Sequence, residues 1–127
     1  MTLGNILSLA CGGALGALSR HFVGTAILHM TGWRGHWGTF AVNMTGCFLI
    51  GFLSTLVALK GHWGIHMRFF FFTGFLGAYT TFSTYMLENF LLVEKGQWGI
   101  GMFNMLGSVV VGFFALWGGI MLARTIS

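Results

Sequence analysis

Four long apolar stretches run along the chain, separated by the short segments "MTGWRGH", "KGHWGIH" and "EKGQW". The pattern predicts membrane-spanning helices over residues 3–29, 36–59, 66–93 and 98–123. Each stretch can cross a hydrocarbon core of about 30 Å, which takes about 20 predominantly apolar residues. The sequence therefore predicts an all-α membrane protein, with residues 1–127 forming a single four-helix transmembrane domain.

The composition agrees with this prediction and excludes several classes of protein. Hydrophobic residues make up 56% of the chain, charged residues only 6%, and the mean hydropathy is +0.84. The N-terminal apolar stretch lacks the basic start of a secretion signal, so we expect it to be retained as the first helix. The isoelectric point of about 9.7 does not indicate nucleic-acid binding, because the basic residues are scattered singly near the helix ends.

Basic residues are almost balanced between the two sides of the predicted membrane domain. Three of them, Lys60, Arg68 and Arg124, fall on the side of the termini, and two, Arg34 and Lys95, on the other. A difference of one charge hardly fixes the orientation of a chain in the membrane. We therefore expect insertion in both orientations and an antiparallel homodimer with its twofold axis in the membrane plane.

Small residues are frequent in the predicted helices and allow close helix packing. The spaced glycines are Gly12 and Gly16, Gly46 and Gly51, and Gly107 and Gly112. They fit either ordinary packing inside a monomer or packing between subunits, and the small size of the chain favours an oligomer.

The middle of the third stretch, "GFLGAYTTFSTYMLENF", is unusually polar for the centre of a membrane span. Its five hydroxyl-bearing residues are Thr80, Thr81, Ser83, Thr84 and Tyr85. With Gly74 and Gly77 beside them, they predict a helix broken between Gly77 and Thr80. A break frees carbonyls that suit Na⁺ and N–H groups that suit a small anion. The alternative is a continuous helix in which Ser and Thr bond back to the preceding turn and bend it.

Polar and aromatic residues of the other spans supply further candidate contacts for an ion. Phe82 and Tyr85 share a helix face, and their positive ring edges can hold an anion. Asn43 with Thr39 in the second span, and Asn104 with Ser108 in the fourth, either pair between helices or line a pathway.

Arg20 and Glu88 are the charged residues expected within or just below the hydrocarbon boundary, where ionisable groups are candidates for function. Arg20 alternatively snorkels to the interface. His62 and His66 flank a glycine in a loop, which disfavours a metal site there. The sequence contains no recognisable catalytic set, so we expect neither an enzyme nor an organic cofactor.

The motifs "GGALGALSR", "GTFAVNMTGCFLIG", "TGFLGAYTTFSTY" and "LGSVVVG" together resemble the CrcB/Fluc family of fluoride channels, across all four spans. The resemblance implies an antiparallel dual-topology homodimer that lets F⁻ leave a bacterial cytoplasm passively through the inner membrane. It also implies a structural Na⁺ at the dimer centre, held by the backbone carbonyls of Gly77 and Thr80. The anion contacts that it implies are Phe82, Asn43 and Ser108, with Thr39, Ser83 and Thr84 as a hydroxyl track and Arg20 and Glu88 near the pore mouths.

Two positions depart from the family's pattern. Tyr85 stands where many relatives carry a second Phe, and Asn104 stands where many carry Tyr. Tyr85 keeps an aromatic edge and adds a hydroxyl, whereas Asn104 removes a ring. The alternative function is a proton-coupled transporter similar to the small multidrug resistance proteins, but those depend on a Glu in the first helix, which this chain lacks.

Overall fold

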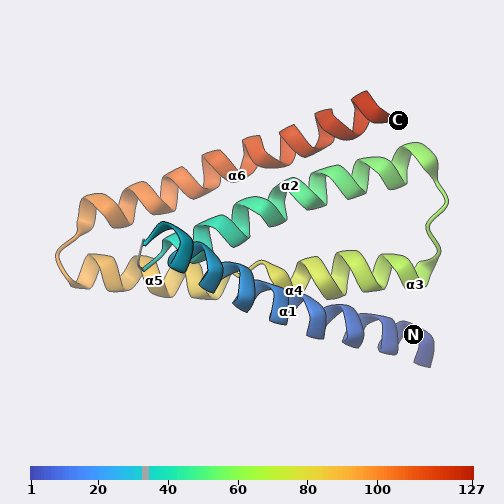
Figure 1. The fold of residues 1–127 in the computed structure, drawn as a ribbon, viewed down its shortest axis with the longest axis horizontal. Helices are drawn as coiled ribbons and strands as arrows, with labels where there is room; N and C mark the ends of the chain where they lie inside the picture. The colour runs from blue at the N-terminus through green and yellow to red at the C-terminus, as the bar shows by residue number, and fades with distance from the viewer. Residues whose placement is uncertain (33–34) are drawn as a thin grey trace.

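The computed structural model describes residues 1–32 and 35–127. Within them the chain is helical, in the order α1 (Leu3–Thr31), α2 (Trp37–Lys60), α3 (Ile65–Arg68), η1 (Phe69–Leu76), α4 (Gly77–Tyr79), α5 (Phe82–Glu94) and α6 (Trp98–Ile126). Figure 1 shows the two termini and the α2–α3 connection at one end of the bundle, with the α5–α6 connection at the other. The all-helical fold class predicted from the sequence is confirmed.

Three of the described helices, α1, α2 and α6, are long and apolar enough to cross a membrane. Their ends lie close to the predicted ones, the largest difference being a predicted end at residue 123 against Ile126. Many large apolar side chains on the outside of the bundle are exposed, as in a protein whose solvent is lipid. The chain is therefore a multi-pass membrane protein.

The segment from Ile65 to Glu94 is a succession of short helical pieces. Its first long piece, η1, is a π-helix of eight residues, which the sequence analysis did not predict. After α4, Thr80 (φ −83°, ψ 156°) and Thr81 (φ −147°, ψ 120°) are extended, and α5 begins at Phe82. The sequence placed the joint at Gly77 to Thr80, but Gly77 to Tyr79 are helical and the extended residues are Thr80 and Thr81.

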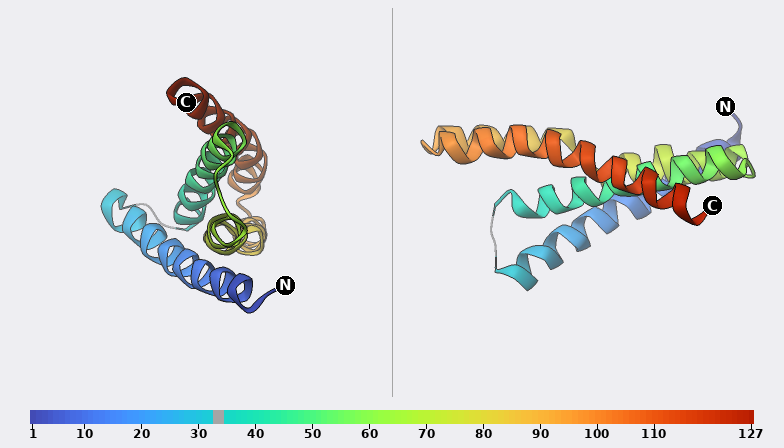
Figure 2. Two further views of the ribbon diagram at one scale, coloured as in Figure 1. Left: turned by 90° about the vertical axis from the view of Figure 1, so that its right-hand side faces the viewer. Right: turned by 90° about the horizontal axis from the view of Figure 1, so that it is seen from above.

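Close packing between helices depends on glycines that face the backbone of a neighbour. A Cβ at Gly12 or Gly16 of α1 would collide with the carbonyl oxygens of Phe70 and Phe75 in η1. Gly51 of α2 meets the carbonyl of Leu116 in α6 in the same way. The views in Figure 2 agree with this arrangement, since α1 and α6 lie on opposite sides of the remaining helices.

Most of the glycines that were considered as association surfaces are therefore used inside the chain. Gly46 faces Thr80, and Gly112 lies against Cys47 and Met44. Gly107 is the exception, because a Cβ there would meet only the ring of its own-helix neighbour Phe103. Small residues thus give little support for a dimer, for which the charge balance remains the stronger indication.

Candidate functional site

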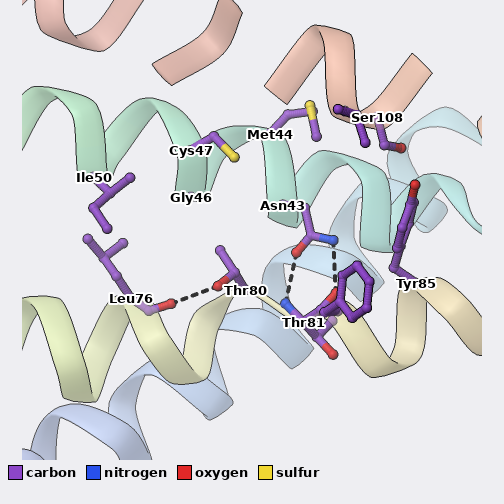
Figure 3. A pocket seen from close by; sticks show the side chains of 12 residues that line it. Asn43, Met44, Gly46, Cys47, Ile50, Leu76, Thr80, Thr81, Tyr85 and Ser108 are labelled. Carbon is purple, nitrogen blue, oxygen red and sulfur yellow. Dashed lines mark hydrogen bonds between the residues drawn. The ribbon is translucent and has the colours of Figure 1, made fainter. Parts of the chain in front are cut away.

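The extended segment between α4 and α5 is held by one side chain of α2. Asn43 accepts from the backbone N–H of Thr81 (2.8 Å) and donates to the carbonyl oxygen of the same residue (3.0 Å). Figure 3 shows this pair of hydrogen bonds, with Asn43 reaching from α2 to the extended backbone. The amide side chain thus satisfies both polar groups of Thr81 where no helix does so.

Thr80 and Thr81 also complete the two helix ends that meet at this joint, the end of α4 and the start of α5. The Thr80 hydroxyl donates to the carbonyl of Leu76 (3.0 Å), which closes α4. The Thr81 side chain accepts from the backbone N–H of Thr84 (3.3 Å) and caps α5, the usual function of Thr at an N-cap. In a continuous helix the Thr81 N–H would bond the carbonyl of Gly77, but here it donates to Asn43. The position of the joint is thus set by Asn43 and threonines, and the glycines do not set it.

A cavity of about 330 Å³ opens beside this joint. We call it the neutral cavity because, among the described residues, no Asp, Glu, Lys, Arg or His lines it. Its lining residues are Asn43, Met44, Gly46, Cys47, Ile50, Leu76, Thr80, Thr81, Phe82, Tyr85, Ser108 and Val109. Figure 3 shows side chains from α2, α6 and both sides of the joint gathered around it. The structure thus brings four predicted anion contacts from three parts of the chain into one space: Asn43, Phe82, Tyr85 and Ser108.

The two aromatic residues of the neutral cavity differ in their surroundings. The ring centroids of Phe82 and Tyr85 are 5.8 Å apart. Phe82 is 74% exposed, whereas Tyr85 is 8% exposed and its hydroxyl donates to the carbonyl of Met105 (2.6 Å). The Tyr85 hydroxyl proton is therefore committed to Met105 and is not offered to the cavity that Tyr85 lines.

Three polar side chains form a buried row that begins at Ser108 and continues through Asn104 to Asn89. The Ser108 hydroxyl donates to Asn104 Oδ1 (3.3 Å), and Asn104 Nδ2 donates to Asn89 Oδ1 (2.6 Å). Asn104 is buried and lies outside the lining of the neutral cavity. Asn104 is instead in contact with Ser108, which does line that cavity.

A second cavity, of about 320 Å³, lies on the other side of the joint, and we call it the charged cavity. Its lining includes Arg20, His21, Thr25, Thr39, Thr81, Thr84 and Glu88. Thr39 donates to Glu88 Oε1 (2.8 Å), while Glu88 Oε2 is buried and has no partner among the described residues. Thr81 lines both cavities, so the two spaces approach each other at this residue.

Three predicted site residues lie outside the cavities, namely Asn104, Ser83 and Gly77. Ser83 is exposed on α5 and lines neither of them, because it is on the face opposite Tyr85. Gly77 is exposed on α4, and Thr80 contributes to the neutral cavity. Arg34, which was counted in the charge balance, lies outside the described residues.

The sequence analysis did not assign a site role to Thr81 or Asn89, which the structure places at the centre of the hydrogen bonding. Thr81 had a usable signal, since a Thr immediately before a new helical stretch is a favoured N-cap. The sequence carries no such signal for Asn89, because a single Asn in an apolar run does not show which helix its side chain faces. A further pair, Thr45 and Tyr79, joins the hydroxyls of α2 and α4 (2.8 Å).

Comparison with known proteins agrees with the motifs. The model of the family described as "CrcB-like protein, Camphor Resistance (CrcB)" matches residues 7–120. The fluoride-specific ion channel FluC of Agrobacterium fabrum is 43% identical over 122 residues, which cover 96% of this chain and 98% of that protein. Proteins of the same name from Solibacter usitatus (43% identical, 93% and 97% covered) and Nitrobacter winogradskyi (40% identical, 95% and 96% covered) are similar to it.

The match covers nearly the whole of the chain and of each relative, and it includes both cavities and the joint between them. The chain therefore belongs to the CrcB family, the family of the fluoride-specific ion channels FluC, whose members are channels and not enzymes.

Proposed function

We propose that this protein is a fluoride-selective channel that lets F⁻ leave a bacterial cytoplasm passively across the inner membrane. The observation that carries the proposal is the pair of cavities that meet at Thr81, one neutral and one charged, within a bundle of membrane helices. The printed function of relatives that are about 40% identical over the whole chain supports the choice of ion.

The lining of the neutral cavity suits a small, hard and strongly hydrated anion. Such an ion enters a pore only where fixed donors replace its water. Asn43 has a second amide hydrogen beyond the one given to Thr81, and the Thr81 hydroxyl proton is also uncommitted in its cap. The ring edges of Phe82 and Tyr85 add positive partial charge without a formal charge.

The charged cavity suits the approach of the ion to this filter. Arg20 attracts an anion into a space that Thr39 and Thr84 line with hydroxyl groups. Glu88 opposes this attraction, and Thr39 holds one of its oxygens. Fluoride would pass Thr81 between the two spaces, with Asn43, Phe82, Tyr85 and Ser108 on the neutral side.

We also propose that residues 65–94 are the fourth membrane crossing, broken at Thr80 and Thr81, and that two chains pair antiparallel. The near balance of basic residues supports both orientations. C-terminal tags in intact cells are expected to report both sides of the membrane, and tags on one side alone would contradict the dual topology.

A structural Na⁺ at the centre of that dimer would be held by the backbone carbonyls of Gly77 and Thr80. The residues fit such an ion, because the Thr81 N–H that would bond the Gly77 carbonyl in a helix donates to Asn43. Oxygen atoms of this kind are the ligands that hard cations prefer. Protein prepared with N-methylglucamine in place of sodium should lose flux and regain it when Na⁺ returns; full flux without sodium would remove this proposal.

Efflux from liposomes tests the function. Vesicles that contain the wild-type chain are loaded with potassium fluoride, valinomycin dissipates the voltage, and a fluoride electrode follows release. Fast release without a proton gradient is expected. No release above that of protein-free vesicles would contradict the channel, and release only with a proton gradient would favour a proton-coupled transporter.

A further inference from the structure

A row of two buried amides, Asn89 and Asn104, ends at Ser108, and of these three residues Ser108 alone lines the neutral cavity. Asn89 of α5 is 1% exposed and Asn104 of α6 is 6% exposed. Asn104 Nδ2 lies 2.6 Å from Asn89 Oδ1, and Asn104 Oδ1 lies 3.3 Å from the Ser108 hydroxyl. Asn89 Nδ2 is buried without a hydrogen-bond partner among the described residues. We call Asn89, Asn104 and Ser108 the amide row.

The hydrogen bonds of the amide row point away from the neutral cavity. Ser108 gives its proton to Asn104, and Asn104 gives one to Asn89. Ser108 therefore presents only oxygen lone pairs to the cavity that it lines. Tyr85 also gives its proton elsewhere, to the carbonyl of Met105. With the hydrogen bonds in this direction, neither the Ser108 hydroxyl nor the Tyr85 hydroxyl can donate to an anion in the cavity.

The hydrogen bonds of the amide row can also run in the opposite direction, and the side chains around the row need not move. The oxygen and nitrogen of an Asn amide are nearly alike in shape, so a half-turn of both amides exchanges donors and acceptors. Asn89 Nδ2 would then donate to Asn104 Oδ1, Asn104 Nδ2 would donate to Ser108, and the Ser108 proton would turn to the cavity. The separation of 3.3 Å between Ser108 and Asn104 is longer than usual for O–H···O and closer to the range of N–H···O.

We propose that Asn89 and Asn104 are positioning residues that set the direction of the Ser108 proton, and that fluoride in the neutral cavity selects the donating direction. An anion binds the state that donates to it better than the state that presents lone pairs, so it shifts the two-state row toward donation. The reversed row aligns three donors toward the ion, which strengthens each of them. This inference rests on the proposed function, because it takes fluoride as the occupant of the cavity.

Side-chain amide resonances offer a direct test in the full chain. The chain has only four asparagines, Asn5, Asn43, Asn89 and Asn104, so labelling asparagine with ¹⁵N gives a simple spectrum. The wild-type protein and Ser108→Ala are placed in lipid nanodiscs and titrated with sodium fluoride or sodium chloride. Fluoride should move the amide signals of Asn89 and Asn104 in the wild-type protein, although Asn89 does not line the cavity.

The other asparagines serve as internal controls. Asn43 lines the cavity and should respond to fluoride in both proteins, which reports that the ion has entered. Asn5 lines neither cavity and should not respond. In Ser108→Ala the response of Asn89 should be lost, and chloride should produce none in either protein.

Failure of this inference is distinguishable from failure of the channel. If Asn43 responds while Asn89 stays unchanged, or if the Asn89 response persists in Ser108→Ala, the reversal is refuted while the channel stands. If wild-type vesicles release no fluoride and Asn43 does not respond, the proposed function itself fails and the inference falls with it. In vesicles Ser108→Ala should release fluoride about tenfold more slowly, as expected for one lost hydrogen bond; wild-type release would overturn the inference.

Discussion

The two cavities that meet at Thr81 are similar in volume, at about 330 and about 320 Å³, but they differ in chemistry. The neutral cavity offers an amide, hydroxyl groups and ring edges, whereas the charged cavity offers Arg20 and Glu88. A positive charge such as that of Arg20 acts over a distance of about 10 Å and attracts any anion, so it raises the local anion concentration. Short-range donors distinguish ions by size and hydration. Under the proposed function, selection and attraction would be assigned to separate spaces.

The largest effect is expected from Asn43→Leu, which removes the one side chain that holds both polar groups of Thr81. Each buried group left unpaired costs roughly 1–3 kcal/mol. We expect fluoride efflux to fall about a hundredfold, because about 1.4 kcal/mol corresponds to a factor of ten. The matched control is Met44→Leu, which alters an apolar residue of the same cavity and should keep wild-type efflux. Equal efflux from Asn43→Leu and the control would remove the neutral cavity from the pathway.

Phe82→Ile tests the ring edge and should reduce efflux about tenfold. An aromatic ring contributes about 0.5–1.5 kcal/mol beyond the area it buries, and Ile keeps the bulk while removing the positive edge. Phe90→Ile is the control, since Phe90 is exposed on the same helix and lines neither cavity. If both variants release fluoride at the wild-type rate, the ring-edge contact is excluded.

Arg20→Gln should lower efflux by a few-fold at low ionic strength, and the loss should shrink as salt is added, because a charge that attracts ions from solution is screened. Arg124→Gln, near the end of α6, serves as the control. If the effect of Arg20→Gln depends on salt while that of Asn43→Leu does not, the charged cavity acts on the ion at long range and the neutral cavity acts by direct contact. A loss that is independent of salt would mean that Arg20 contacts the ion directly.

Glu88→Gln should have the smallest effect and the opposite sign. It removes a negative charge from the charged cavity and keeps an oxygen that can accept from Thr39. We expect efflux at low salt to rise by about twofold, since the charge is partly screened even there. Glu94→Gln, at the exposed end of α5, should change nothing. A fall in efflux would show that the carboxylate is required for passage.

Much of the fold could be predicted from the sequence, because apolar length alone defines membrane helices. The ends of α1, α2 and α6 were predicted to within a few residues. The π-helix η1 could not be predicted, because it packs closely against α1 and the sequence does not show this contact between distant segments. The joint in the third stretch was placed too early for a similar reason: glycines suggested its position, whereas Asn43 from another helix determines it.

The candidate site was predictable where the motif itself carries the chemistry. Asn43, Phe82, Tyr85 and Ser108 were all expected near an anion pathway, and the structure places them around one cavity. The amide row was not predictable, because the contact between Asn89 and Asn104 depends on how α5 and α6 face each other. Ser83 shows the converse, since a hydroxyl in the right motif points away from both cavities.

The most direct test of the division between selection and attraction is simultaneous measurement of fluoride and chloride from the same vesicles. Liposomes loaded with equal amounts of both ions are followed with two electrodes, for the wild-type protein and for Arg20→Gln. The expected result is release of fluoride and retention of chloride by both proteins, with Arg20→Gln slower but equally selective. Release of chloride alongside fluoride from the wild-type protein would contradict a neutral selective cavity, as would a loss of selectivity confined to Arg20→Gln.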